Sequence, residues 1–199
     1  ASIGLILDVS GSIEKQFARA KHAAMAFLRA LNPVDEFCLL TFADQPRVEA
    51  GFTRDVSKIQ ERVKVADPVG ETALYDAVYL CLKQMKYGHH PRKAILLITD
   101  GEDTQSRYSF ANLRQALKES DIQIYAVGIE SCSFFDSGCS ILEHMTRLTG
   151  GSAYFLRSFS ELQEICMNIA KELKSQYVLG YSSSNPTKDG HWRKIKVKL

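Results

Sequence analysis

Short apolar runs alternate with longer segments of helical periodicity, and this alternation restricts the possible folds more than any other feature. The runs Ile3–Leu7 and Ala94–Thr99 hold almost no polar residue, which is typical of parallel strands buried on both faces. Segments 13–31 and 72–86 instead repeat apolar residues every three or four positions, as amphipathic helices do. Parallel strands need long crossover connections, usually helical. We therefore predict an α/β fold, Rossmann-like and doubly wound, with a mainly parallel sheet flanked by helices.

The same reading extends along the chain to about residue 175. Further strands are expected at 37–42, 48–52, 122–129 and 153–156, and further helices at 109–119, 141–149 and about 160–175. Beyond this point, Tyr177–Tyr181 is strand-like, 182–190 is rich in turn residues, and 192–199 alternates apolar with polar residues. Two strands joined by a short loop pair antiparallel. We therefore predict a single domain over 1–199, with an α/β core at 1–175 and a C-terminal β-hairpin extension at 176–199.

The composition is that of an ordinary folded domain. The chain has 199 residues, of which 45% are hydrophobic and 24% charged, so global disorder is excluded. No apolar run approaches the ~18 residues of a membrane helix. The chain opens inside its first predicted strand without a leader, so we expect a segment of a longer protein. A net charge of +2 does not by itself indicate nucleic-acid binding. The basic segment 188–199 fits either a solvated strand face or contact with an anionic surface.

The five cysteines fall into two groups. Cys38, Cys81 and Cys166 lie on apolar stripes and are expected in the core. Cys132 and Cys139 lie in a polar segment with Gly and Ser. A disulfide between these two would imply an oxidising compartment and an extracytoplasmic parent protein, either secreted, periplasmic or on the cell surface. Two free thiols in a cytosolic loop are the alternative.

Polar side chains follow the strongest predicted strands. Asp8-Val9-Ser10-Gly11-Ser12 follows the first strand, Asp100 follows the strand at 94–99, and Thr72 precedes the clearest helix. In open α/β sheets, ligands bind beyond the carboxyl ends of the central strands. These segments offer two carboxylates, three hydroxyls and no soft ligand, which suits a hard cation such as Mg²⁺ or Mn²⁺ rather than Ca²⁺. The candidate metal ligands are Asp8, Ser10, Ser12, Thr72 and Asp100.

Asp-x-Ser-x-Ser is a weak pattern by itself, because Ser and Asp also favour helix starts. Its coincidence with a buried strand, a Thr before a helix and an Asp-Gly after another strand favours a site. Glu71, Glu102 and Asp103 are expected either to shape the rim of this site or to lie in solvated loops. Asp76 is expected to make a structural hydrogen bond, and His89–His90 to face solvent.

The candidate ligands resemble the metal-ion-dependent adhesion site of the von Willebrand factor type A (VWA) family. That site combines Asp-x-Ser-x-Ser, a distant Thr and an Asp after a central strand, and all five positions are filled here. The context Glu71–Ala77 is also similar, and the resemblance extends from residue 1 to about 175. The ending, Tyr177–Tyr181 followed by Asp189–Ile195, resembles a bacterial VWA-related group often described from acidobacteria.

The resemblance implies a binding module and not an enzyme. In the family, the Ser and Thr hydroxyls touch the metal, one or both aspartates act through water, and an open position takes Asp or Glu from a partner. It therefore implies an adhesion-type protein–protein interaction through Mg²⁺, with no nucleic acid and no direct membrane insertion. A metal-dependent phosphoester hydrolase and a structural domain with an unused site are the alternatives. Against the hydrolase, Ser10 stands where a second Asp would be needed, and no Gly-rich phosphate loop or nucleophile–base pair is visible.

Overall fold

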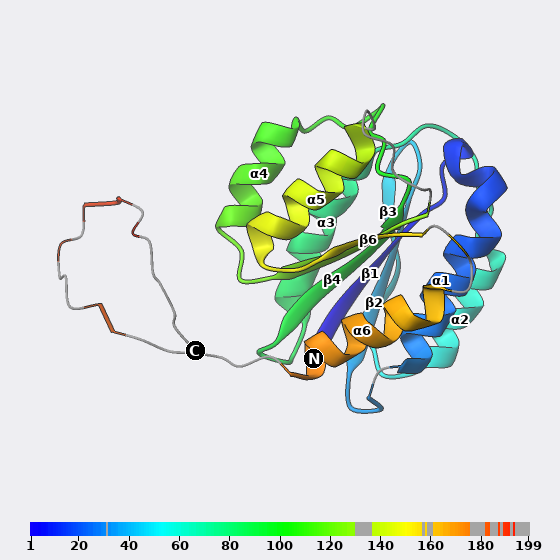
Figure 1. Cartoon of the computed structure of the whole chain (residues 1–199), viewed down its shortest axis with the longest axis horizontal. Coiled ribbons are helices and arrows are strands. Elements are labelled where there is room, and N and C mark those ends of the chain that lie inside the picture. The colour runs from blue at the N-terminus through cyan, green and yellow to red at the C-terminus, as the bar shows by residue number, and fades with distance from the viewer. Residues whose placement is uncertain are drawn as a thin grey trace.

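A six-stranded sheet runs through the molecule in the order β3-β2-β1-β4-β5-β6 (Figure 1). The computed structural model describes residues 1–30, 32–129, 137–156, 158, 161–175, 182–183, 187, 189–191 and 193. The strands are Ser2–Asp8 (β1), Glu36–Phe42 (β2), Pro46–Thr53 (β3), Lys93–Thr99 (β4), Gln123–Gly128 (β5) and Ala153–Phe155 (β6). Every neighbouring pair is parallel except β2 and β3, which pair antiparallel. The expectation of a mainly parallel α/β sheet is confirmed.

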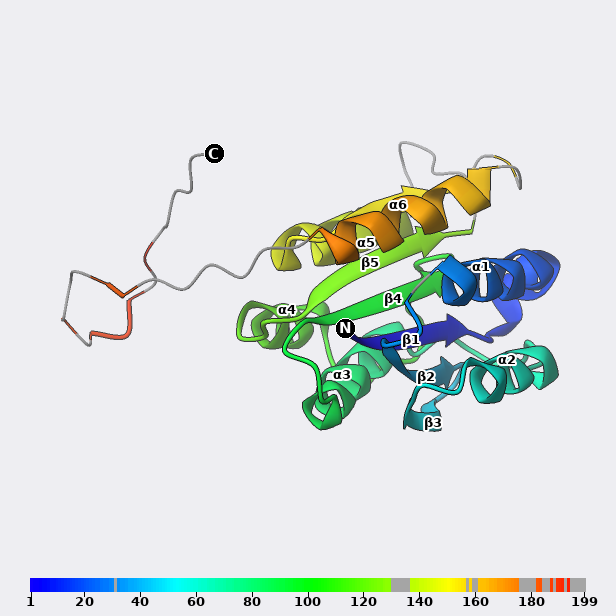
Figure 2. The same cartoon turned by 90° about the horizontal axis from the view of Figure 1, so that it is seen from below.

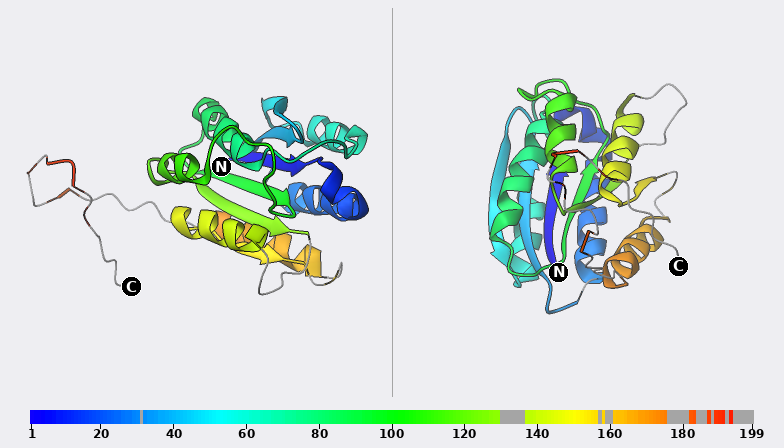
Figure 3. Two further views of the ribbon diagram at one scale, coloured as in Figure 1. Left: turned by 90° about the horizontal axis from the view of Figure 1, so that it is seen from above. Right: turned by 90° about the vertical axis from the view of Figure 1, so that its left-hand side faces the viewer.

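Helices cover both faces of the sheet (Figures 2 and 3). One face packs against α1 (Phe17–Ala30), α2 (Val56–Val65) and α6 (Leu162–Lys174). The other packs against α3 (Leu74–Gln84), α4 (Phe110–Lys118) and α5 (Ser137–Thr149). On β1, Leu5 and Leu7 belong to the first core, whereas Ile6 belongs to the second. A strand that buries both faces must be apolar throughout, which explains the uninterrupted apolar runs.

Two helix starts and one whole helix differ from the sequence prediction. The first helix opens as a six-residue 3-10 helix, Gly11–Gln16, before α1 begins at Phe17. Helix α5 begins at Ser137, four residues before the predicted start at 141. The prediction missed this first turn, Ser-Gly-Cys-Ser, because it carries no apolar periodicity. Helix α2 was not predicted: only Ile59 and Val63 are buried in it, and charged residues dominate the rest.

The three cysteines expected in the core, Cys38, Cys81 and Cys166, are buried free thiols, so that prediction is confirmed. Cys139 was expected in a polar loop, but it lies in the first turn of α5 and is disulfide-bonded. Cys132, its expected partner, lies outside the described residues.

The predicted C-terminal hairpin also falls outside the described part of the chain. Tyr177–Tyr181 and nearly all of 192–199 are not described, so the hairpin stays a prediction. Among the described residues, no helix is both long enough and apolar enough to cross a membrane.

Candidate functional site

The order of the strands brings the two predicted carboxylates to one edge of the sheet. Strands β1 and β4 are parallel neighbours, with Leu7 opposite Ile98. Asp8 ends β1 and Asp100 directly follows β4, so both emerge at the carboxyl ends of the two central strands. This is the edge where ligands of open α/β sheets bind.

Four of the five predicted side chains form a continuous chain of polar contacts. Ser10 Oγ donates to Asp8 Oδ1 at 2.6 Å, and Ser12 Oγ donates to Asp100 Oδ2 at 2.6 Å. The two hydroxyl oxygens, Ser10 Oγ and Ser12 Oγ, lie 3.0 Å apart. Either hydroxyl can donate in this contact, and each proton is also within reach of a carboxylate. The result is a cluster rich in oxygen, with two hydroxyl protons shared among four side chains.

Thr99 completes the surroundings of Asp8, and the sequence analysis did not single it out as a site residue. Its Oγ1 donates to Asp8 Oδ2 at 2.6 Å and accepts from Gly101 N at 3.0 Å. It is fully buried at the end of β4. The sequence signal that points to Thr99 is a polar residue at the end of an otherwise apolar strand.

The carboxyl group of Asp8 is buried and held by three donors. Ser10 N, Ser10 Oγ and Thr99 Oγ1 all donate to it. The pKa of Asp8 is raised from 3.8 to about 6, mainly by burial and in small part by the nearby charge of Asp100. The hydrogen bonds from Ser10 and Thr99 act in the opposite direction. A cation beside this carboxylate would offset the cost of its burial.

Thr72, the fifth predicted residue, is fixed mainly through its backbone. It is buried just before α3, and its carbonyl oxygen accepts from Thr104 N at 2.9 Å and Gln105 N at 3.0 Å. Its own N–H donates to Thr104 Oγ1 at 3.1 Å. Among the described residues, no hydrogen bond joins the Thr72 hydroxyl to the other four side chains. Thr104 therefore acts as a clamp on Thr72.

The segment before Thr72 is tied to the loop that carries the serines. Gly11 N donates to Gly70 O at 2.8 Å, and Val69 N donates to Val9 O at 2.8 Å. These two bonds align residues 69–70 with residues 9–11. Thr72 is thus held at the same edge of the sheet as Ser10 and Ser12.

The acidic residues around the site have defined contacts. Asp103 was weighed as a rim residue or a solvated loop residue, but its Oδ1 accepts from Tyr75 N at 3.1 Å, at the start of α3. Glu71 Oε2 accepts from Thr104 Oγ1 at 2.9 Å. Glu102 is exposed. Asp103 and Glu71 therefore hold the two segments around Thr72 together.

Asp76 makes the structural hydrogen bonds expected of it. Its Oδ1 accepts from the backbone N–H groups of Arg107 and Tyr108, each at 3.0 Å. These bonds fasten the end of the segment after β4 to the first turn of α3.

The expectation that the histidine pair faces solvent is confirmed for His89 and wrong for His90. His89 is exposed but bonded to Glu36, through its N–H at 2.5 Å and its Nδ1 at 2.9 Å. His90 is half-buried, and its buried Nε2 has no hydrogen-bond partner among the described residues. Burial by itself raises the pKa of Glu36, but hydrogen bonds from Ser2 and His89 lower it to about 2. Glu36 begins β2, so this cluster lies at the opposite edge of the sheet from Asp8.

The donor set fits a hard divalent cation. It offers carboxylate and hydroxyl oxygens only, which Mg²⁺ and Mn²⁺ prefer. The described part of the chain holds no group of three or more His, Cys, Asp or Glu side chains suited to a metal. The proposed site has only two such side chains, Asp8 and Asp100, and takes its other three oxygens from hydroxyl groups.

Comparisons with known proteins agree with this architecture. The model of the family described as von Willebrand factor type A domain matches residues 3–102. Cuticlin-6 from Caenorhabditis elegans is 28% identical over 135 residues, which are 63% of this chain but only 23% of the cuticlin. The chain thus spans about a quarter of that relative.

Solved structures show the same fold. The conserved hypothetical protein BatB from Bacteroides thetaiotaomicron superposes with a TM-score of 0.71 at 19% identity, over 88% of this chain and 100% of that one. The vWF domain of the type V pili tip protein Mfa5 from Porphyromonas gingivalis gives 0.75 at 12% identity, over 92% of this chain and 98% of that one. At these identities the likeness concerns the fold alone.

Proposed function

Because the chain belongs to the von Willebrand factor type A domain family, we propose that it is a metal-dependent protein-interaction module of the adhesion type. Domains of this family are typically adhesion or interaction modules that bind protein ligands, and they are generally not catalytic. One observation carries the metal-dependent part of the proposal. The oxygens of Asp8, Ser10, Ser12 and Asp100 converge at the edge where the central strands end.

Asp8, Ser10, Ser12, Thr72 and Asp100 would hold Mg²⁺, or Mn²⁺ in its place. The bound cation would supply an electrophilic centre able to accept a carboxylate oxygen from outside. The protein's own part is to orient the oxygens beforehand. Thr99 Oγ1 and Ser10 N fix the Asp8 carboxylate, and Thr104 fixes the backbone of Thr72.

The partner we propose is a protein that presents an Asp or Glu to this cation. In the family one or both aspartates act through water, so few anionic ligands touch the cation directly and it stays electrophilic towards an anionic ligand. Two further proposals concern the parent protein. The segments Tyr177–Tyr181 and Asp189–Ile195 support membership of the bacterial VWA-related group described from acidobacteria. The disulfide at Cys139 supports a secreted, periplasmic or cell-surface location.

Calorimetric titration with Mg²⁺ tests the proposal. Wild type should bind the cation, Asp8→Ala should not, and Asp121→Ala, which alters an exposed carboxylate elsewhere, should behave as wild type. Protein retained on immobilised wild-type domain in Mg²⁺ should be released by EDTA and should not bind Asp8→Ala. Equal Mg²⁺ binding by wild type and Asp8→Ala would place the cation elsewhere, and turnover of phosphate esters would favour the hydrolase.

A further inference from the structure

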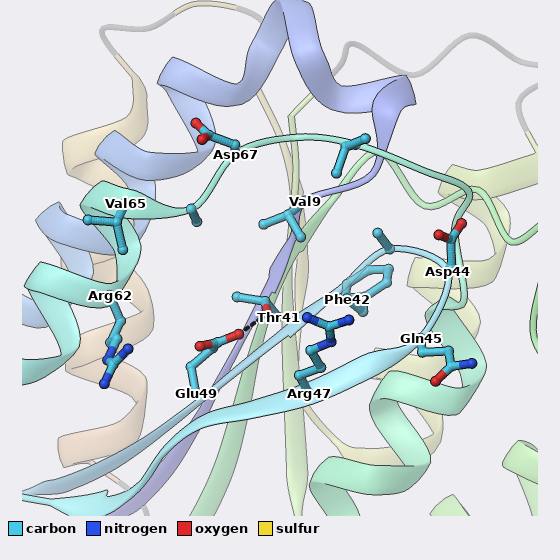
Figure 4. A pocket seen from close by; sticks show the side chains of 13 residues that line it. Val9, Thr41, Phe42, Asp44, Gln45, Arg47, Glu49, Arg62, Val65 and Asp67 are labelled. Carbon is cyan, nitrogen blue, oxygen red and sulfur yellow. Dashed lines mark hydrogen bonds between the residues drawn. The ribbon is translucent and has the colours of Figure 1, made fainter.

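A groove of about 460 Å³ lies beside the proposed metal site (Figure 4). The β2–β3 hairpin forms its floor, and the end of α2 and the segment after it form its roof. The residues that line it are Val9, Thr41–Gln45, Arg47, Glu49, Arg62, Val65–Asp67 and Val69.

The groove and the metal site share a wall. Val9 lines the groove, whereas its neighbours Asp8 and Ser10 belong to the proposed metal site. The roof is bonded to this wall through Val69 N and Val9 O at 2.8 Å. At the other end, Asp44 Oδ1 accepts from Glu71 N at 2.7 Å, one residue before Thr72. A peptide bound to the cation therefore has the groove next to it.

Cationic side chains in the groove lack an ionic partner. Neither Arg47 nor Arg62 forms an ion pair with any other described residue, and both are exposed. Arg47 rises from β3 toward the middle of the groove (Figure 4). Of the three lining carboxylates, Glu49 accepts from Thr41 Oγ1 at 2.9 Å and Asp44 accepts the backbone N–H described above, whereas Asp67 lies on the roof, away from Arg47 (Figure 4). None of the three forms an ion pair with Arg47, so its guanidinium can bind an anion from outside.

The roof of the groove exposes apolar side chains. Val65 and Val69 are 72% and 71% exposed, respectively, and both line the groove. Two largely exposed valines and an unpaired arginine in one groove suit a ligand that brings both an apolar side chain and a carboxylate.

We propose that this groove recognises the segment flanking the metal-bound acid of the partner, taking a second Asp or Glu on Arg47 and an apolar side chain against Val65 and Val69. The inference rests on the proposed function, since the first acid is the one bound to the cation. The partner would therefore present an acidic–apolar peptide segment with two carboxylates and not a single isolated one.

Peptide display tests this specificity. The probe is a library in which one central Asp is fixed and the flanking positions are random, selected in Mg²⁺ and in EDTA. The baits are wild type, Asp8→Ala, Arg47→Glu and the matched control Arg114→Glu, which reverses an exposed charge on α4. The side chain of Arg47 makes no hydrogen bond to another described residue, so its replacement should leave the fold intact, as circular dichroism would verify.

We expect wild type in Mg²⁺ to enrich a second Asp or Glu at one fixed spacing, together with an apolar residue. Arg47→Glu should enrich Lys or Arg at that position, and Arg114→Glu should match wild type. In a selected peptide, Gln in place of the second acid should weaken binding about tenfold to wild type and little to Arg47→Gln.

The failures are distinguishable. Two outcomes would refute the proposed role of the groove and leave the proposed function standing. One is Mg²⁺-dependent enrichment that needs the fixed Asp but shows no second acid. The other is a motif on Arg47→Glu that is the same as on wild type. Enrichment of acidic peptides in EDTA that Arg47→Glu abolishes would support the groove and refute the metal mechanism. The same enrichment on Asp8→Ala and on Arg47→Glu as on wild type in Mg²⁺ would refute both.

Discussion

Replacing Asp8 by asparagine should stabilise the metal-free domain at neutral pH and abolish its response to Mg²⁺. Burial raises the pKa of Asp8 from 3.8 to about 6. A carboxyl group whose pKa is raised by folding ionises more readily in the unfolded chain. Its ionised form therefore destabilises the fold above about pH 6, and this penalty disappears as the pH falls through the window from 6 to 3.8.

The rise in the pKa sets the size of the effect. At about 1.36 kcal/mol per pKa unit, ionised Asp8 costs at most about 3 kcal/mol at pH 7. Asparagine removes the charge but also replaces one acceptor with a donor, which would face Thr99 Oγ1. The Thr99 hydroxyl proton then loses its acceptor, Asp8 Oδ2, at a cost of about 1 kcal/mol. We expect Asp8→Asn to gain about 1–2 kcal/mol at pH 7 in EDTA, and to lose this gain near pH 4.

Urea unfolding in EDTA across this pH range measures the difference, with Asp121→Asn as the control for an exposed carboxylate. Adding Mg²⁺ at a hundredfold excess over its Kd should stabilise wild type by about 2.7 kcal/mol and leave Asp8→Asn unchanged. The reasoning would be refuted if Asp8→Asn were less stable than wild type at neutral pH in EDTA, or if the difference in unfolding free energy did not depend on pH. Either result would show that ionised Asp8 does not destabilise the metal-free fold.

Three further outcomes are expected. Glu36→Gln should lower the free energy of unfolding at pH 7 by at most about 3 kcal/mol, because folding lowers the pKa of Glu36 to about 2. Denaturation curves should show this loss of stability fading as the pH falls from 4.5 towards 2. Thiol titration of the unfolded, unreduced chain should count three free thiols, and five would exclude the bond at Cys139. Thr104→Val should leave the buried N–H of Thr72 without its acceptor, at a cost of about 1–3 kcal/mol, and weaken Mg²⁺ binding in calorimetry. Thr104→Ser keeps the hydroxyl and should bind Mg²⁺ as wild type does.

The central strands and most helices could be predicted because their patterns are local. The composition alone indicates that both faces of two strands are buried, because the runs Ile3–Leu7 and Ala94–Thr99 are almost entirely apolar. Helix α2 has a short apolar stripe, Val56, Ile59 and Val63, which the sequence prediction missed because polar and charged residues surround it. Only Ile59 and Val63 of this stripe are fully buried, so the helix depends on packing against the sheet more than on its local pattern.

The candidate site was predictable for a different reason. Asp8, Ser10 and Ser12 lie within five residues, and Asp100 follows a recognisable strand. That β1 and β4 are neighbours is a long-range fact, which the residues of either strand do not record. Thr104 escaped prediction because its contact with Thr72 spans 32 positions. Such residues are found by topology and not by motif.

The segment between α2 and α3 connects the groove to the proposed metal site. Its first part roofs the groove through Val69, and its last part carries Thr72. Hydrogen bonds from Gly11 to Gly70 and from Glu71 to Asp44 fasten it on both sides. Asp8 ends β1 and Asp100 directly follows β4, so the sheet itself holds these two ligands. Thr72 depends on the segment between α2 and α3, and Ser10 and Ser12 flank Gly11, which is bonded to it. A displacement of the groove roof would therefore move Thr72 and disturb the serine loop through Val9 and Gly11, while Asp8 and Asp100 stay in place.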